Sequence, residues 1–243
     1  FNALEYIPGV TVRYVGSVGE LGQPDLLILP GTKNTMDDLL WLRQNGLEAA
    51  TLRHAASGRP VIGICGGYQM LGERLDDPDG IEHGGTLRGM GLLPAKTIFE
   101  PQKIRTRAAG RFEAVGGIFS GLSGAEFEGY EIHMGVTVPT GDCRALGTIH
   151  TLGGLSAQKT DGLQSGNVYG SYLHGFFDRE GVAQAIVGAL LREKGLDETQ
   201  LHSVDLDAHK QCQYDRLADA VRLHLDMPAV YRILQEGVTS DEP

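Results

Sequence analysis

Cys65 stands where a covalent nucleophile is expected. It lies in the segment GICGGYQ (residues 63–69), directly after the apolar run 60–64 and before a stretch with helical character. A nucleophile on a tight turn from strand to helix needs small residues two positions before and two after it. Gly63 and Gly67 occupy these positions, so the segment predicts a nucleophile elbow that carries a thiol. A cysteine that is merely small and buried on a glycine-rich turn is the alternative.

The start of a helix favours anions, and this predicts how the thiol of Cys65 is activated. Unpaired backbone amides and the helix dipole stabilise a thiolate there, so we expect a lowered thiol pKa. The amide of Gly66 would face the oxyanion of a tetrahedral intermediate, and Gly31, in the loop after a neighbouring strand, would supply a second donor. Gly31 and Gly66 are therefore the predicted oxyanion hole.

A thiol that cleaves amides needs a general base that also protonates the leaving amine, and histidine suits this role. Of the eight histidines, His174 ends the apolar run 168–173 and precedes Gly175, so it is expected at the same sheet edge as Cys65. We predict that His174 is the base. A strand-end histidine bonded to a loop carbonyl is the alternative.

His133 is the competing histidine, because it lies within the alternating segment 127–138 and shares one face with Glu131. Tyr130 belongs to the opposite face of the same segment. The polar face indicates a substrate contact, a structural pair or a solvated strand surface, and the sequence leaves these three open.

The pattern of apolar runs predicts the elements that position these residues. Runs 25–29 and 60–64 have the length and composition of buried strands, and helices are expected at 35–45, with Thr35 as the N-cap, and at 47–57. Further strands are expected at 11–15, 96–99, 111–115, 127–138, 144–151 and 167–173, and further helices at 181–194, at 205–226 and from Pro228 onward. The strand–helix–strand order predicts an α/β fold with a mostly parallel open sheet, flanked by helices, and a helical C-terminal tail.

Composition and charge restrict the class of protein. The net charge of −10 and the lack of a Lys/Arg cluster argue against nucleic acid and anionic membrane surfaces as partners. No stretch approaches the roughly 18 apolar residues of a membrane helix, and nothing resembles a signal peptide. The three cysteines are far apart and match neither a disulfide framework nor a zinc site, so we expect no metal and a cytoplasmic location.

Three segments resemble one family of enzymes. GICGGYQMLG (63–72), YEIHMG (130–135) and YLHGFFD (172–178) are similar to the class I glutamine amidotransferase domain of the cobyric acid synthase family. LPGTKNT (29–35) and DLLWL (38–42) share this similarity, which covers most of residues 1–178. Related cobyrinic acid a,c-diamide synthases usually carry a different sequence around the cysteine, with an acidic residue before it, so Ile64 and the pair Tyr68-Gln69 favour the cobyric acid branch.

The resemblance implies a flavodoxin-like class I glutamine amidotransferase domain over residues 1–200, lacking its first strand, and a helical extension over 201–243. It implies that Cys65 attacks glutamine, that His174 is its base, and that the oxyanion hole is formed as described above. The residues implied to line the glutamine site are Gln69, Tyr130, Glu131 and His133. One position departs from the pattern of many class I amidotransferases, because Phe176 stands where they carry the acidic third member of a triad. Asp178 is a weak candidate for that role.

By this resemblance, the domain hydrolyses glutamine through a Cys65 thioester. The ammonia would amidate side-chain carboxylates of adenosylcobyrinic acid a,c-diamide in cobalamin biosynthesis. No cofactor is expected in this domain. ATP and Mg²⁺ are expected in an N-terminal synthetase domain of the same polypeptide, where the corrinoid acceptor would bind. The sequence has no Walker-type loop and opens at Phe1 in the run-up to a strand, so we expect such a domain upstream.

Three other hypotheses remain open. The first is the glutaminase of another amidotransferase, either a cobyrinic acid a,c-diamide synthase or the peptidoglycan-amidating type. The second is an α/β cysteine hydrolase, although such enzymes usually carry histidine directly after the cysteine, where Gly66 stands. The third is a scaffold that keeps the fold without catalysis, against which the presence of both Cys65 and His174 argues.

Overall fold

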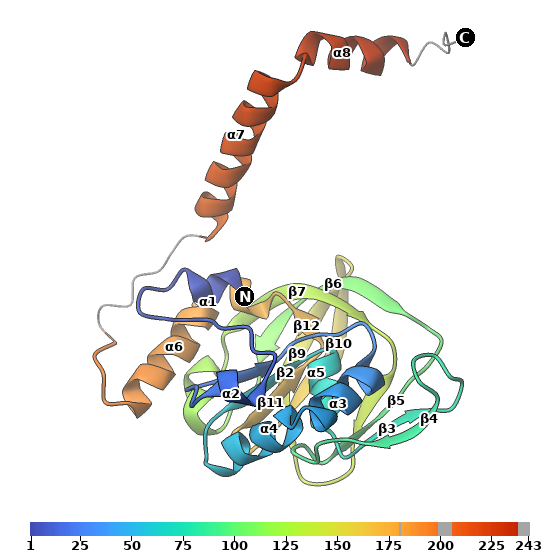
Figure 1. Cartoon of the computed structure of the whole chain (residues 1–243), viewed down its shortest axis with the longest axis vertical. Coiled ribbons are helices and arrows are strands. Elements are labelled where there is room, and N and C mark those ends of the chain that lie inside the picture. The colour runs from blue at the N-terminus through green and yellow to red at the C-terminus, as the bar shows by residue number, and fades with distance from the viewer. Residues whose placement is uncertain (180, 199–205, 238–243) are drawn as a thin grey trace. The chain divides into compact units, whose positions relative to one another are not determined.

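The structure, a computed structural model, describes residues 1–179, 181–198 and 206–237 of the chain (Figure 1). By their contacts the residues divide into two units, Phe1–Ser203 and Val204–Pro243. Among the described residues, no helix has the length and the apolar character needed to cross a membrane.

Short helices and strands follow one another along the first unit. Its helices are α1 (Asn2–Glu5), α2 (Val18–Leu21), α3 (Thr35–Gln44), α4 (Leu47–Ala56), α5 (Gly66–Leu71) and α6 (Val182–Glu193), with the 3₁₀ helices η1 (Gly117–Leu122) and η2 (Phe176–Asp178). Its strands are β1 (Leu27–Leu29), β2 (Val61–Ile64), β3 (Arg74–Asp77), β4 (Gly85–Arg88), β5 (Ala95–Ile98), β6 (Ile104–Phe112), β7 (Glu126–His133), β8 (Val136–Pro139), β9 (Arg144–Leu152), β10 (Leu155–Ser165), β11 (Val168–Ser171) and β12 (Leu173–His174).

The main sheet is mixed and mostly antiparallel, so the expectation of a mostly parallel open sheet is wrong. Its strand order is β1-β2-β11-β10-β9-β6-β7-β12. β2 pairs in parallel with β1 and β11, whereas every other pair of neighbours is antiparallel. The physical reason is the length of the connections: β9 and β10 are joined by a two-residue turn, and a parallel crossover needs about a dozen residues.

The main sheet curls back on itself. β11 is the third strand in the order and β12 is the last, yet only Tyr172 separates them in the chain. One residue spans roughly 3.8 Å, and neighbouring strands lie roughly 4.8 Å apart, so β12 has to return to the side of β11. The curl therefore brings β7 and β12 close to the end of β2.

A second sheet has the order β4-β3-β5-β8, and the chain passes between the two sheets four times: from β2 to β3, from β5 to β6, from β7 to β8 and from β8 to β9. β7 lies in the main sheet and β8 in the second, with a break at Met134 and Gly135. Gly135 has a φ of 86°, and a Cβ atom on it would lie 2.8 Å from the carbonyl oxygen of Ile98. The strand expected over 127–138 is thus two strands in different sheets.

Helices α3, α4 and α5 pack around the parallel part of the main sheet (Figure 1). Their buried side chains share a core with those of the strands, including Leu29, Met36, Leu39 and Leu71. The N-cap of α3 is Asn34 and not Thr35, because the side chain of Asn34 accepts the amide of Asp37 at 3.0 Å.

Helix α6 packs against α1, η1 and η2. Lys194, directly after α6, forms an ion pair with Asp25 at 2.9 Å, which connects this helix to the segment before β1. Because Asp25 and Lys194 are both half exposed, this pair contributes roughly 0–1 kcal/mol and serves mainly to set the position of α6.

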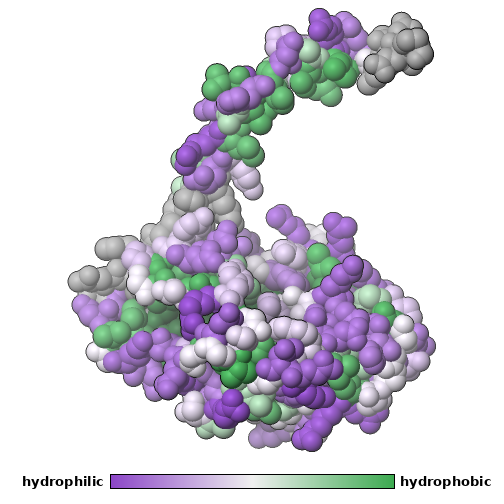
Figure 2. Space-filling model, in the orientation of Figure 1, coloured by the Kyte–Doolittle hydropathy of each residue, from purple (hydrophilic) through white to green (hydrophobic). Residues whose placement is uncertain are grey.

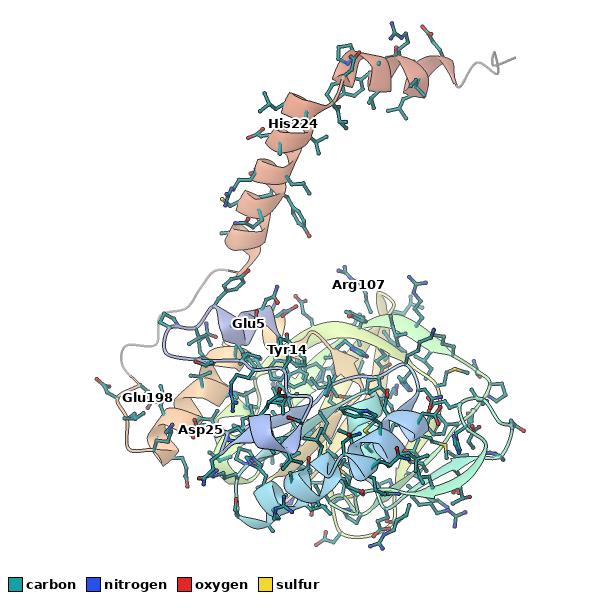
Figure 3. All side chains as sticks on the ribbon, in the orientation of Figure 1. Glu5, Tyr14, Asp25, Arg107, Glu198 and His224 are labelled. Atoms are coloured by element: carbon teal, nitrogen blue, oxygen red, sulfur yellow. The ribbon has the colours of Figure 1, made fainter. Side chains whose placement is uncertain are left out.

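Most of the expected elements of the first unit are confirmed, and several differ besides the strand that divides into β7 and β8. No strand forms at 11–15, where the chain is irregular and the hydroxyl of Tyr14 donates to Glu5 at 3.4 Å (Figure 3). The strand expected at 111–115 is the end of the longer β6, and β10 was not expected. Residues 155–160 of β10 are largely polar or small, so they give no apolar signal.

The second unit consists of α7 (Leu206–His224) and α8 (Met227–Glu236), which confirms the helices expected there. Asp226 caps α8 by accepting the amide of Ala229 at 3.1 Å, and Pro228 lies in the first turn. Figure 2 shows apolar side chains gathered along both helices. The exposed ones include Tyr214, Leu217, Val221, Leu223, Leu225, Tyr231, Ile233 and Leu234.

Candidate active site

Cys65 has the one positive φ among the non-glycine residues that the structure describes. Its φ of 53° and ψ of −112° lie in a region that residues with a Cβ atom avoid. β2 ends at Ile64 and α5 begins at Gly66, so Cys65 alone makes the turn from strand to helix. Its amide donates to the carbonyl of Ser171 at 2.8 Å, and its carbonyl accepts the amide of Gln69 at 3.0 Å. This is the geometry of a nucleophile elbow.

The glycines on either side of Cys65 are required by contacts with backbone atoms. A Cβ atom on Gly63 would lie 2.7 Å from the carbonyl oxygen of Gly67. One on Gly67 would lie 2.1 Å from the carbonyl oxygen of Leu29. Neither distance leaves room for a side chain, so α5 packs directly against β1 and β2.

Gly31, Cys65 and His174 meet at one point although they belong to separate parts of the chain. Gly31 lies in the loop between β1 and α3, Cys65 on the elbow and His174 at the end of β12. A Cβ atom on Gly31 would lie 2.7 Å from Cε1 of His174 and 3.4 Å from Cβ of Cys65. The structure therefore brings the predicted nucleophile, the predicted base and the first oxyanion-hole residue together.

The loop after β1 also lies directly against Gly66. A Cβ atom on Gly66 would lie 2.6 Å from Oγ1 of Thr32 and 3.1 Å from the amide nitrogen of Thr32. The amide of Gly66 is close enough to the sulfur of Cys65 to act on its pKa. Backbone amides of the two segments thus flank the nucleophile, as an oxyanion hole requires. Thr32 was missed by sequence reasoning, and its position next to Gly31 was the available signal.

The thiol of Cys65 is neutral in the free domain, which corrects the expectation of a lowered pKa. Burial raises the pKa of Cys65 to about 11, and the charge of Glu82 acts in the same direction, whereas the amide of Gly66 opposes them. The sulfur donates a hydrogen bond to the carbonyl oxygen of Ile132 at 3.3 Å. Desolvation therefore outweighs the helix terminus at this site.

His174 is a neutral imidazole stacked on a tyrosine. Its ring and that of Tyr130 are nearly parallel, with centroids 5.1 Å apart and an interplanar angle of 2°. Burial lowers the pKa of His174, and its Nε2 atom is buried without a hydrogen-bond partner. Among the described residues no hydrogen bond joins this imidazole to a carboxylate, and Phe176 is a buried core side chain packed on Phe112.

The polar face of β7 is the buried face, so the hypothesis of a solvated strand surface is wrong. Glu131 is fully buried and His133 is 6% exposed, whereas Tyr130 on the other face is 46% exposed. Glu131 forms an ion pair with Lys159 of β10 at 2.8 Å. This ion pair occupies the carboxylate of Glu131 and places it inside the curled sheet.

His133 lies next to the ion pair and is held in one tautomer. Its Nδ1–H donates to the carbonyl of Gly135 at 3.1 Å, and its ring stacks on that of Tyr172 with centroids 3.7 Å apart. Burial lowers the pKa of His133 to about 4, so the ring is neutral at pH 7. Its Nε2 atom is therefore a buried acceptor, and it has no partner within the described structure.

Gln69 braces the elbow from inside the molecule. Its side-chain nitrogen donates to the carbonyl of Met134 at 2.9 Å, and its oxygen accepts the hydroxyl of Thr35 at the same distance. Both ends of the amide are thus bonded, and the residue is 2% exposed. The position of Gln69 is near the site, but its contacts hold α3, α5 and the segment directly after β7 together.

Glu82 is a second residue near the site that sequence reasoning missed. Its carboxylate accepts the amides of Thr35 at 2.7 Å and Met36 at 3.2 Å, which places it at the N-terminus of α3. The buried carboxylate of Asp77 holds its loop by accepting the amides of residues 81–84. No local pattern marks Glu82, because its partners lie 46 and 47 residues away.

Three buried polar side-chain atoms of the described structure have no hydrogen-bond partner, and each belongs to a segment that lies against the elbow. They are Oγ1 of Thr32, Nε2 of His133 and Nε2 of His174. Buried polar groups are nearly always bonded, so such a cluster marks a place where a polar ligand belongs. Within residues 1–179, 181–198 and 206–237, no group of three or more His, Cys, Asp or Glu side chains is arranged to hold a metal ion.

An elbow cysteine beside a strand-end histidine, on this α/β fold, defines a class I glutamine amidotransferase. A crystal structure of a glutamine amidotransferase shares the fold with a TM-score of 0.53 and 19% identity, covering 80% of this chain and 92% of that one. The chain belongs to the CobB/CobQ-like glutamine amidotransferase domain family, whose model matches residues 1–182.

Curated relatives in this family carry the name cobyric acid synthase. The protein of Ruminiclostridium cellulolyticum is 52% identical over 239 residues, which are 98% of this chain and 46% of that protein. The protein of Lachnoclostridium phytofermentans is 46% identical over 245 residues, covering 98% of this chain and 48% of that protein. The chain thus spans about half the length of the curated relatives it matches.

Proposed function

We propose that this chain is the glutaminase domain of a cobyric acid synthase. Its identity of 52% to a relative of that name, along nearly the whole chain, supports this assignment over another amidotransferase of the family. The observation that carries the glutaminase chemistry is the meeting of Gly31, Cys65 and His174 at one point, bordered by buried polar atoms without partners.

The first half of the reaction releases ammonia. His174 takes the thiol proton of Cys65, and the sulfur attacks the side-chain carbonyl carbon of glutamine. The amides of Gly31 and Gly66 bind the oxyanion that forms. The carbon–nitrogen bond then breaks, and the leaving nitrogen takes the proton from His174 and departs as ammonia, which leaves a glutamyl thioester on Cys65.

The second half restores the enzyme. His174 removes a proton from water, and the resulting hydroxide attacks the thioester carbonyl. The sulfur of Cys65 leaves and regains its proton from His174, while glutamate is released. The net change is hydrolysis of glutamine to glutamate and ammonia, with no cofactor consumed in this domain.

The resting protonation states of Cys65 and His174 predict that the domain by itself hydrolyses glutamine slowly. The proton has to pass from a thiol whose pKa is about 11 to an imidazole whose pKa burial lowers. Each pKa unit of that gap costs about 1.4 kcal/mol before any attack occurs. Bound glutamine and the oxyanion contacts must offset this cost, so we expect the rate to depend strongly on how the site is closed.

His133 is the residue we expect to contact glutamine directly. Its Nε2 lone pair is buried and free, so it suits an N–H donor of the substrate. Tyr130 lines the site beside His174. Gln69 and Glu131 support the site through their bonds to neighbouring segments. In this proposal Glu131 and Gln69 hold the walls of the site without touching glutamine.

The ammonia would be consumed in the portion of the enzyme outside this chain. We propose that an N-terminal synthetase domain of the same polypeptide activates carboxylates of adenosylcobyrinic acid a,c-diamide with ATP and Mg²⁺, in the cytoplasm. The length of the relatives, about twice that of this chain, supports the existence of such a domain.

Glutamate release from glutamine tests the assignment. We expect release by the wild type to be abolished by Cys65→Ala and His174→Ala and unchanged by Cys143→Ala, a cysteine away from the elbow. We also expect release to rise when the full-length enzyme is given the corrinoid and ATP. No release under any of these conditions, or full release by Cys65→Ala, would contradict the proposal.

A further inference from the structure

In the part of the chain that the structure describes, no carboxylate bonds to the imidazole of His174, yet its ring has a defined neighbour. Tyr130 and His174 are paired directly opposite one another in the β7–β12 ladder. Their rings lie on the same side of the ladder, with centroids 5.1 Å apart and planes within 2°. The imidazole is therefore stacked parallel to the phenol ring with a sideways offset, which is a preferred arrangement of aromatic pairs.

We propose that Tyr130 is the positioning residue of His174, and that the face of its ring does the work of the missing carboxylate. The inference rests on the proposed glutaminase function and adds how the base is held. Stacking fixes the plane of the imidazole, and the electron-rich face of an aromatic ring attracts the cation that forms when His174 takes the thiol proton.

The backbone around the pair is built to keep the two rings together. A Cβ atom on Gly129 would lie 2.0 Å from the carbonyl oxygen of His174, so the two strands approach one another too closely for any other residue. Gly175, with a φ of 82°, ends β12 directly after His174. The strand is thereby held at the position where Tyr130 faces the imidazole.

The part of Tyr130 that would stabilise a charged His174 is the face of its ring and not its hydroxyl. Stabilisation of a cation by the ring face does not use the hydroxyl, so phenylalanine should serve as well as tyrosine. Tyr130 is 46% exposed, so its ring is no core side chain whose loss would empty the interior. A function through His174 can therefore be separated from a function in folding.

Other titratable groups near the imidazole have to be taken into account. Cys65 of the elbow and His133 of β7 are two of these groups. A positive charge on His174 disfavours a positive charge on His133, and so it lowers the pKa of His133. Asp178 follows in η2, where its carboxylate lies near Gly175. These groups are the same in all variants of the test, so differences between variants report on Tyr130.

The test compares Tyr130→Phe, Tyr130→Leu and Tyr130→Ala with Glu128→Ala, a control on the same exposed face of β7. We expect kcat for glutamine hydrolysis to fall roughly ten-fold in the Leu and Ala variants, with KM within about two-fold, and to stay near the wild-type value in the Phe variant. Thermal unfolding of each variant establishes that it is folded, and Tyr130→Leu keeps a large apolar side chain while it removes the aromatic ring.

Alkylation of Cys65 by iodoacetamide, followed by mass spectrometry across pH, provides a second readout that needs no turnover. At neutral pH the reaction depends on His174 to take the thiol proton, so the Leu and Ala variants should react roughly ten-fold more slowly. Above about pH 10 hydroxide removes the proton, and all variants should react alike.

Three results would overturn the inference. A rise in KM with an unchanged kcat would show that Tyr130 binds glutamine instead. Equal loss in Tyr130→Phe and Tyr130→Ala would show that the hydroxyl is what matters. Alkylation that is slowed equally at every pH would indicate a general disturbance of the site. If the wild type hydrolyses no glutamine, the proposed function fails, while the alkylation profile still decides the role of Tyr130.

Discussion

The sulfur of Cys65 lies 3.3 Å from the carbonyl oxygen of Ile132, and the thiol donates a hydrogen bond to it. The nucleophile is thus bonded to a strand 67 residues further along the chain. This bond uses the proton that has to leave before attack, so it stabilises the resting thiol. It agrees with the direction in which burial moves the pKa of Cys65.

Alkylation of Cys65 should therefore rise with pH far beyond the range of an ordinary cysteine. With a pKa of about 11, the thiolate is scarce at pH 8, and we expect the rate of reaction with iodoacetamide to keep increasing above pH 9. Cys212, which is exposed, serves as the internal reference in the same sample. A rate for Cys65 that levels off below pH 8 would contradict the neutral resting thiol.

Removing the charge of Glu82 should make Cys65 more reactive. Glu82 raises the pKa of Cys65, so Glu82→Gln lowers that pKa and increases the thiolate fraction at every pH below it. Glutamine keeps an acceptor for the amides of Thr35 and Met36. We expect alkylation at pH 8 to be about two-fold to five-fold faster than in the wild type.

The matched control for this change is Glu113→Gln, whose carboxylate accepts the hydroxyl of Thr148 outside the active site. It should leave the alkylation rate of Cys65 unchanged. Equal rates for Glu82→Gln and the wild type would mean that the charge of Glu82 does not reach the sulfur.

Gly67→Ala should destabilise the domain severely, because the new Cβ atom would lie 2.1 Å from the carbonyl oxygen of Leu29. Backbone atoms do not yield as a flexible side chain does, so we expect a loss of about 3 kcal/mol or more in the free energy of unfolding. Gly19→Ala is the control, since no atom lies within 4 Å of its Cβ position. Urea unfolding measures both, and a loss below about 1 kcal/mol for Gly67→Ala would contradict the tight packing of α5 on β1.

Asp161 should make the domain less stable as pH rises from about 4 to 6. Burial raises the pKa of Asp161 from its ordinary 3.8 to about 6, so the folded state holds this proton more tightly than the unfolded state does. Stability from Asp161 is present below the lower value and is lost as pH passes the higher one, by about 2–3 kcal/mol. Asp161→Asn should remove this fall, which denaturant unfolding at several pH values would detect.

His133 changes the stability of the domain in the opposite direction over nearly the same pH range. Its pKa falls from the ordinary 6.5 to about 4 in the folded state, so the unfolded state binds the proton more readily, and stability rises with pH between these values. The two groups partly cancel in the wild type. His133→Asn should therefore reveal the fall due to Asp161, and a pH profile identical to the wild type in both variants would refute the assignment of both protonation states.

The elbow and the base are predictable from sequence because short-range requirements mark them. Gly63 and Gly67 flank Cys65, and an apolar run ends at His174. The neighbouring residues in the sequence therefore indicate that Cys65 lies on a turn and His174 at the end of a strand. The N-cap of α3 shows that the sequence does not place a helix boundary to the exact residue. Asn34 and Thr35 are both good N-cap residues, and only the fold decides between them.

The direction of the strands and the burial of β7 are not predictable in the same way. A hydrophobic run has the same composition in a parallel and an antiparallel pair, so the sheet order depends on partners that no single segment reveals. Glu131 is fully buried only because Lys159, on a strand of largely polar residues, supplies the compensating charge. The sequence shows both residues but not that they meet.

The amide of Cys65 bonds to the carbonyl of Ser171, and the chain reaches His174 only three residues later. No hinge or flexible loop lies between the nucleophile and the base, because one backbone hydrogen bond and three residues connect them. A rigid-body movement elsewhere in the protein would therefore not separate the nucleophile from the base. Any signal that switches hydrolysis on has to arrive through the segments that lie against it, such as the Gly31 loop or the loop of Glu82.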